Sequence, residues 1–209
     1  MEKTNETKNL ILKKSREIFL KKSLFNSTMS DIAERAGLSR RTIYRYFDTK
    51  EDLAYEITIE LLNEWNSYQK EIFTNLRGTG IERLEIFLNK LIDYMSEKAD
   101  VMRYLSEFDF YFQDKTTHAA NEISKNRFNK IILKSDDLLE EIMILGKKDK
   151  SIKKDIDIKL IVATISNVLW SFGQRIAIRG ESIKKEYNLD GISLIKKQVD
   201  IYIAAIKEE

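Results

Sequence analysis

The chain has 209 residues, of which 43% are hydrophobic and 33% charged, and its net charge is +2. That length allows one or two domains with a hydrophobic core, and no run approaches the roughly 18 apolar residues of a membrane span. The absence of cysteine excludes a disulfide framework and thiolate chemistry. With no proline and only seven glycines, the sequence has few turn signals and favours an all-α fold.

The charge is unevenly distributed along the chain. Residues 1–50 carry a net charge of +6, whereas the rest of the chain carries −4. This asymmetry is expected when one end meets phosphate and the other does not. The N-terminus also lacks the long apolar core of a signal peptide, and together with the missing cysteines this predicts a cytoplasmic protein.

The first predicted helix has an apolar stripe with lysines on its other sides. The stripe consists of Leu10, Ile11, Ile18, Phe19 and Leu20. This helix precedes two shorter ones and would complete their core.

The segment Thr28–Lys50 is typical of a helix-turn-helix. Thr28 and Asp31 have the spacing of a capping box, which indicates a helix start. Gly37 tolerates the left-handed backbone that follows a helix end, and Ser39 is a good N-cap for the next helix.

The second helix of this motif has two different sides. On a helical wheel Ile43 and Phe47 face the core, whereas Arg41 and Arg45 lie on the opposite side, and no acidic residue occurs between Ser39 and Phe47. This is the layout of a DNA recognition helix. The alternative is a short helical hairpin with a solvated basic face.

We therefore predict a set of DNA contacts of three kinds. Base contacts in the major groove are expected from Arg40, Arg41 and Thr42, and Arg45 reads a base or grips the backbone. Phosphate contacts are expected from side chains near helix starts and on the flanks, namely Thr28, Tyr44, Tyr46 and Lys50.

The motif DIAERAGLSRRTIYRYFDTKEDL resembles the N-terminal domain of TetR-family transcriptional regulators, and the resemblance covers about the first sixty residues. It implies a DNA-binding domain at residues 1–52 and a helical ligand-binding and dimerisation domain at residues 53–209. Beyond about residue 65 only length and helical layout carry the match. Arg41 stands where the family often has a small residue. The base that this position contacts therefore cannot be inferred from the family.

Helical periodicity continues through the body of the chain. The expected helices are Lys50–Asn75, Ile81–Lys98, Asp100–Gln113 and a longer one near His118–Leu145, followed by a charged break at Gly146–Asp155.

The two C-terminal helices are apolar on two sides. The first, within Asp157–Ile178, has Ile165 and Leu169 on one face and Leu160 and Trp170 on another. A helix with two apolar faces must be covered twice. Either both helices are central in one chain, or one face contacts a second subunit, and the resemblance implies a four-helix dimer interface formed by these last two helices.

The body is also rich in aromatic residues, which are either core or the lining of an apolar ligand pocket. The resemblance favours a pocket for a small-molecule inducer that releases DNA. The candidate lining residues are Phe87, Met95, Tyr104, Phe108, Tyr111, Phe112, Phe128 and Trp170.

Enzymatic chemistry has no support in the sequence. The single histidine, His118, is more typical of a surface or capping residue, and no metal-ligand set, phosphate loop or catalytic triad is present. We therefore expect no cofactor, no metal and no enzyme. The predicted function is a homodimeric repressor released from a palindromic operator by an apolar ligand. The alternative is an architectural DNA-binding protein that no small molecule regulates. The sequence also leaves open whether the protein represses or activates transcription.

Overall fold

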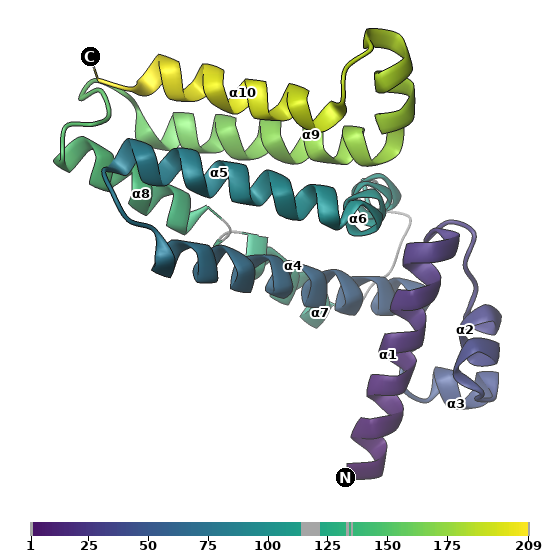
Figure 1. The fold of residues 1–209 in the computed structure, drawn as a ribbon. Coiled ribbons are helices and arrows are strands. Elements are labelled where there is room, and N and C mark those ends of the chain that lie inside the picture. The colour runs from purple at the N-terminus through teal and green to yellow at the C-terminus, as the bar shows by residue number, and fades with distance from the viewer. Residues whose placement is uncertain (1, 114–121, 133, 135, 209) are drawn as a thin grey trace. The chain divides into compact units, whose positions relative to one another are not determined.

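The computed structural model describes residues 2–113, 122–132, 134 and 136–208 of the chain, and within that part it contains ten α-helices (Figure 1). The predicted all-α fold is confirmed. The chain forms two compact units, Met1–Glu64 with Arg103–Ile132 and Trp65–Met102 with Leu133–Glu209. The compact unit that holds the predicted helix-turn-helix thus extends beyond Asp52 and includes a segment from the middle of the chain.

The first unit is built from the N-terminal helices and a later helical segment. It contains α1 (Glu2–Lys22), α2 (Met29–Ala36), α3 (Arg40–Tyr44), the first part of α4 (Lys50–Asn75), most of α6 (Ala99–Tyr111) and α7 (Glu122–Ile132). The apolar stripe predicted for α1 supplies Ile11 and Phe19 to the core, which also receives Ile32 from α2 and Ile43 from α3. Each helix of the predicted helix-turn-helix therefore has one buried side.

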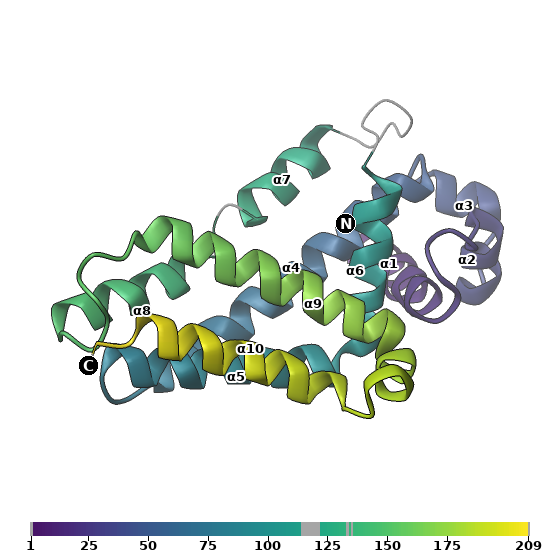
Figure 2. The ribbon, with the colours of Figure 1, turned by 90° about the horizontal axis from the view of Figure 1, so that it is seen from above.

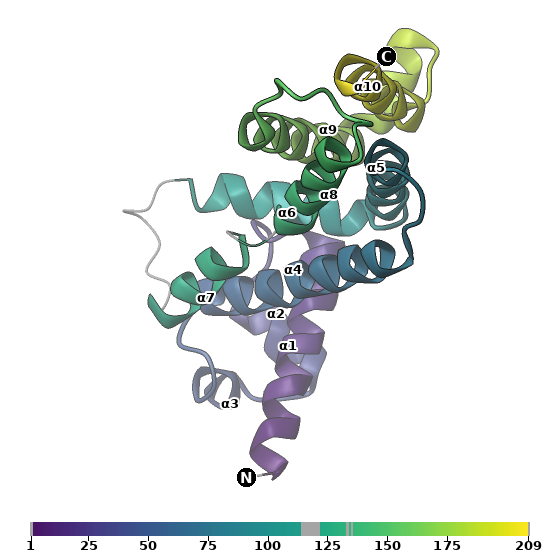
Figure 3. The same ribbon diagram turned by 90° about the vertical axis from the view of Figure 1, so that its left-hand side faces the viewer.

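The second unit is a helical bundle. It contains the rest of α4, α5 (Gly80–Glu97), α8 (Asp137–Lys148), α9 (Ile158–Tyr187) and α10 (Gly191–Ile206). α5 contacts α8, α9 and α10, and Figure 3 shows these helices close together, whereas α10 overlies α5 in the view of Figure 2. None of the helices in the described residues has the length and hydropathy needed to cross a membrane.

The helix expected near His118–Leu145 is wrong as a single element. α7 ends at Ile132, and α8 begins at Asp137 in the other unit. Asp136 is the N-cap of α8 and its carboxylate accepts a hydrogen bond of 2.7 Å from the Ser166 hydroxyl on α9. This long-range contact fixes a helix start where the local pattern shows only continued periodicity. His118 lies outside the described residues.

The two apolar sides predicted for α9 are present, but their membership differs from the expected one. Ile165 and Leu169 are buried as expected, whereas Val168 is exposed, and Trp170 packs against the core. α8 and α10 both contact α9. Two sides of α9 are therefore covered by helices of the same unit. The residues that stay exposed include Leu160, Ala163, Thr164, Asn167, Val168, Ser171 and Ile178.

Two glycines set how closely α5 and α8 approach each other. A Cβ atom added to Gly80, the first residue of α5, would lie 2.1 Å from the Cα of Gly146 in α8. Main chain cannot move aside as a flexible side chain does, so this contact requires the absence of a side chain. The Gly80 amide also donates to the Asp149 carboxylate at 2.7 Å, which holds the two helix ends together.

We predict that Gly80→Ala lowers the free energy of unfolding of the protein by about 1–3 kcal/mol, because the helices must separate to admit the methyl group. Gly180→Ala in α9 is the matched control. Its Cβ would meet only Ile176 Cγ2 at 3.9 Å, and Ala is favoured over Gly in a helix by about 0.5–1 kcal/mol. Denaturant titration followed by circular dichroism should therefore move the two variants in opposite directions. Equal midpoints for Gly80→Ala and wild type would refute the close contact.

Candidate DNA-binding surface

The start of α2 is fixed by a reciprocal capping box. The Thr28 hydroxyl accepts from the Asp31 amide at 3.1 Å, and the Asp31 carboxylate accepts from the Thr28 amide at 2.8 Å. Lys22 donates to the same carboxylate at 2.9 Å. The Lys22 and Thr28 hydrogen bonds favour the ionised form and lower the pKa of Asp31 to about 2. The capping box predicted from Thr28 and Asp31 is confirmed.

The turn between α2 and α3 depends on the backbone conformation of Gly37. Its φ is 64°, in the left-handed region, and no atom lies within 4 Å of where a Cβ would stand. Backbone strain rather than lack of space therefore selects glycine here. The amides of Gly37 and Leu38 donate to Glu34 and Ala33, at 3.1 and 2.9 Å, and satisfy the end of α2.

α3 is short and is held at both ends. The Ser39 hydroxyl accepts from the Thr42 amide at 3.1 Å, and the chain continues after Tyr44 in a hydrogen-bonded turn that brings Phe47 to the core. Ile43 is fully buried. The predicted division of this segment into a buried apolar side and a solvent side is confirmed for these residues.

The solvent side of α3 is cationic. Arg40, Arg41 and Arg45 are exposed, and within the described residues none of the three forms an ion pair. Tyr44 is 50% exposed, and the Arg45 guanidinium lies over the ring of Tyr46, 5.3 Å from its centroid. Thr42 and Tyr46 are partly buried. The structure therefore brings together six of the predicted DNA contacts in one short segment.

The other two predicted contacts, Thr28 and Lys50, make hydrogen bonds within the protein. The Thr28 hydroxyl belongs to the capping box and is exposed. The Lys50 ammonium donates to the Leu24 carbonyl at 2.9 Å and lies 5.1 Å from the centroid of the Tyr111 ring. Burial lowers the pKa of Lys50, because the charged form loses hydration. The Lys50 ammonium is directed toward these internal groups.

The residues predicted to line a ligand pocket fall into both units. Tyr104, Phe108, Tyr111, Phe112 and Phe128 belong to the first. Phe108, Phe112 and Phe128 surround Tyr55, with ring centroids 5.0, 4.7 and 5.7 Å from its own. Tyr104 is buried, and its hydroxyl donates to the Ala54 carbonyl at 3.0 Å. These rings form a packed cluster in which the buried hydroxyl of Tyr104 is satisfied.

Phe87, Met95 and Trp170 belong to the second unit. Phe87 is fully buried in its core, and Trp170 contacts Trp65 edge-on at 5.6 Å. Met95 lines a cavity of about 380 Å³ between α5, α9 and α10, whose apolar wall is formed by Gly173, Ile176, Gly191, Ile192 and Ile195. Arg179 and Lys184 also line this cavity. Apart from Met95, these lining residues were not predicted from the sequence. The predicted candidates are mainly aromatic side chains, whereas the apolar wall of the cavity is aliphatic.

The comparisons with known proteins agree with this geometry. Residues 11–57 match the model of the bacterial regulatory proteins of the TetR family, over the segment that contains most of α1, all of α2 and α3, and the start of α4. Residues 11–57 are therefore a TetR-family helix-turn-helix DNA-binding domain.

A repressor and two solved structures extend the similarity beyond this segment. The HTH-type transcriptional repressor KstR2 of Rhodococcus jostii is 24% identical over 153 residues, which cover 73% of this chain and 71% of the relative. The fatty acid degradation regulator FadR of Bacillus halodurans has a TM-score of 0.66 at 17% identity and covers 94% of both chains. The FadR of Bacillus subtilis, solved in complex with stearoyl-CoA, has a TM-score of 0.65 at 18% identity, with 93% of this chain and 96% of that chain covered. Both structural likenesses show that the TetR-like fold extends over nearly the whole chain.

Proposed function

We propose that the chain is a homodimeric TetR-family repressor that binds a palindromic operator and is released from it by an amphiphilic acyl ligand. The observation that carries the DNA-binding part is the cationic side of α3. Its arginines are exposed and form no ion pair within the described residues, on a helix whose other side is fixed by the buried Ile43. The repressor polarity is supported by the similarity to KstR2 of Rhodococcus jostii.

The proposed contacts follow from exposure and from position on α3. Arg40, Arg41 and Thr42 at the start of the helix enter the major groove, where an arginine fork can bind guanine O6 and N7 together. Arg45 lies at the end of the helix and contacts a base or a phosphate. Thr28, Tyr44 and Tyr46 contact phosphates and fix the position of the motif on the duplex.

The dimer is proposed to form through the exposed apolar residues of α9 and α10. Leu160 and Ile201 are 62% and 53% exposed, and Val168 and Ile178 of α9 are exposed as well. Figure 1 shows α9 and α10 side by side. A two-fold dimer presents two recognition helices to two half-sites, which is what a palindrome requires.

An acyl ligand is proposed because two independent features support it. The cavity in the second unit has an aliphatic part without an aromatic residue, which suits a flexible acyl chain, and a polar part that includes Arg179 and Lys184, which suits an anionic head group. The Bacillus subtilis FadR structure contains stearoyl-CoA. We propose that such a ligand favours a conformation of the dimer whose recognition helices no longer match the operator.

Arg41→Ala is expected to weaken binding to the preferred operator by about 1–3 kcal/mol and to relax the base preference at one position per half-site. The reason is the loss of a bidentate base contact. Sequencing DNA selected by the purified wild-type and variant proteins gives both the preference and its two-fold symmetry. Arg35→Ala is the control, since Arg35 is an exposed arginine of α2 that pairs with Glu17 at 3.0 Å. Selected sequences that are the same for Arg41→Ala and wild type would exclude Arg41 as a base-reading residue.

Ile201→Glu is expected to convert the dimer to a monomer, because it places a charge in a desolvated apolar interface. Sedimentation velocity at micromolar concentration measures the change. Ile144→Glu is the matched control, since Ile144 is 51% exposed on α8, outside the proposed interface. A wild-type monomer, or dimers of both variants, would contradict the proposed interface.

Stearoyl-CoA is expected to release wild-type protein from the selected operator, whereas free coenzyme A is not. Binding should also change the tryptophan fluorescence, because the only tryptophans, Trp65 and Trp170, contact each other in the second unit. Ala177→Phe places a ring in the cavity that Ala177 lines. This variant should bind operator normally and resist release. If no acyl-CoA releases the wild-type protein, regulation by this class of ligand is excluded.

A further inference from the structure

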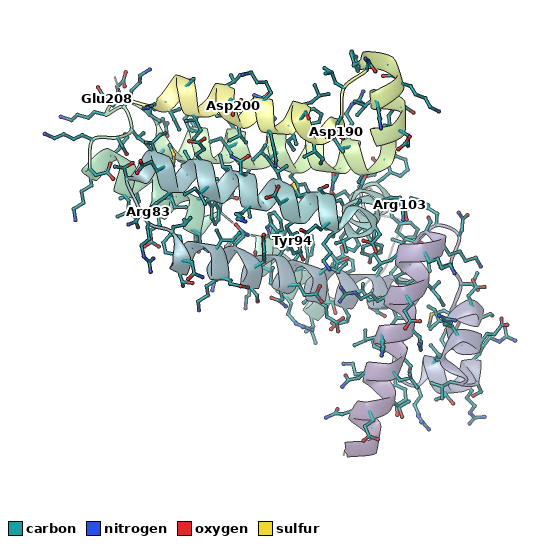
Figure 4. The ribbon with its side chains drawn as sticks, viewed as in Figure 1. Arg83, Tyr94, Arg103, Asp190, Asp200 and Glu208 are labelled. Carbon is teal, nitrogen blue, oxygen red and sulfur yellow. The ribbon has the colours of Figure 1, made fainter. Side chains whose placement is uncertain are left out.

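Three polar side chains of α6 contact the end of α1 and the segments next to it. Arg103, Glu107 and Tyr111 are spaced four residues apart and so share one side of the helix. Arg103, labelled in Figure 4, donates to the Leu20 carbonyl at 3.1 Å, and Glu107 accepts from the Leu24 amide at 2.8 Å. α6 therefore satisfies main-chain groups that the end of α1 leaves without a helical partner.

The third member of the stripe connects α6 to the start of α4. The Tyr111 hydroxyl donates to the Glu51 carboxylate at 2.6 Å, and its ring lies beneath the Lys50 ammonium. The same ring contacts Phe25 edge-on at 5.2 Å. Tyr111 thus contacts both the α1–α2 connection and the first turn of α4.

The connection between α1 and α2 needs such external support. Ser23 has a φ of 85°, in the left-handed region that is unfavourable for a residue with a side chain. The buried Leu24 follows it, and both of its main-chain groups are hydrogen-bonded: the carbonyl accepts from the Lys50 ammonium, and the amide donates to the Glu107 carboxylate. The connection leads directly to Thr28, the N-cap of α2.

The charge of Lys50 is compensated by groups of the first unit, which include the neighbouring Glu51 as well as the Leu24 carbonyl and the Tyr111 ring. Lys50 is the first residue of α4, where the helix dipole disfavours a positive charge. The Leu24 carbonyl and the face of the Tyr111 ring supply part of the compensating negative potential. Both partners lie within the first unit, so the interaction does not require DNA.

We propose that Lys50 is a positioning residue for DNA binding and not a phosphate ligand. With Glu107 and Tyr111 it forms a clasp that fixes the α1–α2 connection, and thereby Thr28 and the helix-turn-helix that begins there. This proposal rests on the proposed DNA-binding function.

The salt dependence of operator binding separates the two roles. Lys50→Met keeps the aliphatic stem but removes the charge, and it should lower operator affinity about tenfold through loss of the charged hydrogen bond to Leu24. If Lys50 acts by positioning, the slope of log affinity against log salt stays that of the wild type. Loss of one phosphate contact would instead reduce the slope by about 0.9. Lys13→Met, which removes an exposed lysine of α1, is the control for a general change in charge.

Tyr111 provides an independent test. Tyr111→Ala removes the ring beneath Lys50 and should lower affinity as Lys50→Met does, whereas Tyr111→Phe keeps the ring and should retain most of the affinity. The double variant of Lys50→Met and Tyr111→Ala should lose less than the two single losses multiplied, because both remove one interaction.

The proposal is overturned if Lys50→Met reduces the salt slope by about one phosphate contact, whatever the affinity of Tyr111→Ala. It is also overturned if neither variant changes affinity. A wild-type protein that selects no DNA sequence would instead reject the proposed function, and with it the role of the clasp in DNA binding.

Discussion

The DNA-binding surface depends on a helix that has no stability of its own. α3 contains five residues, and an isolated helix of that length does not form in water because nucleation costs more than the few hydrogen bonds return. It persists because Ile43 and Phe47 are buried, because Ser39 caps its start, and because Gly37 turns the chain back from α2. Each arginine of this segment is placed by apolar and main-chain interactions on its opposite side.

The same dependence extends outward from α3. α3 contacts α2, and α2 contacts α1 and begins at Thr28, directly after the connection in which Leu24 is buried. The Leu24 carbonyl accepts a hydrogen bond from Lys50 of α4, and the Leu24 amide donates one to Glu107 of α6. The geometry of the reading helix is therefore set in part by residues far along the chain, including Glu107, which is 83 positions from Leu24.

Sequence reasoning succeeded where the determining interactions are local. The capping box at Thr28 and Asp31, the turn at Gly37 and the span of α4 all depend on residues a few positions apart, and the structure contains each of them. The break between α7 and α8 was missed because it depends on a hydrogen bond from Ser166, 30 positions beyond Asp136. The orientation of Lys50 was missed for the same reason, since Leu24 is 26 positions away. The cavity lining was missed because aliphatic residues on packed helices have the same sequence pattern whether they line a cavity or fill a core.

The exposed arginines of the DNA-binding surface repel one another in the free protein. Three arginines within six positions face solvent without an ion pair among the described residues, so their mutual repulsion opposes the folded state of this segment. Other arginines of the same unit are paired, as Arg35 is with Glu17 and Arg127 with Glu56. The repulsion is relieved when phosphates and base acceptors approach, so part of the favourable free energy of binding comes from removing an unfavourable term in the free protein. A surface whose cations were already neutralised by acidic neighbours would gain little from DNA, and the absence of acidic residues between Ser39 and Phe47 avoids that loss.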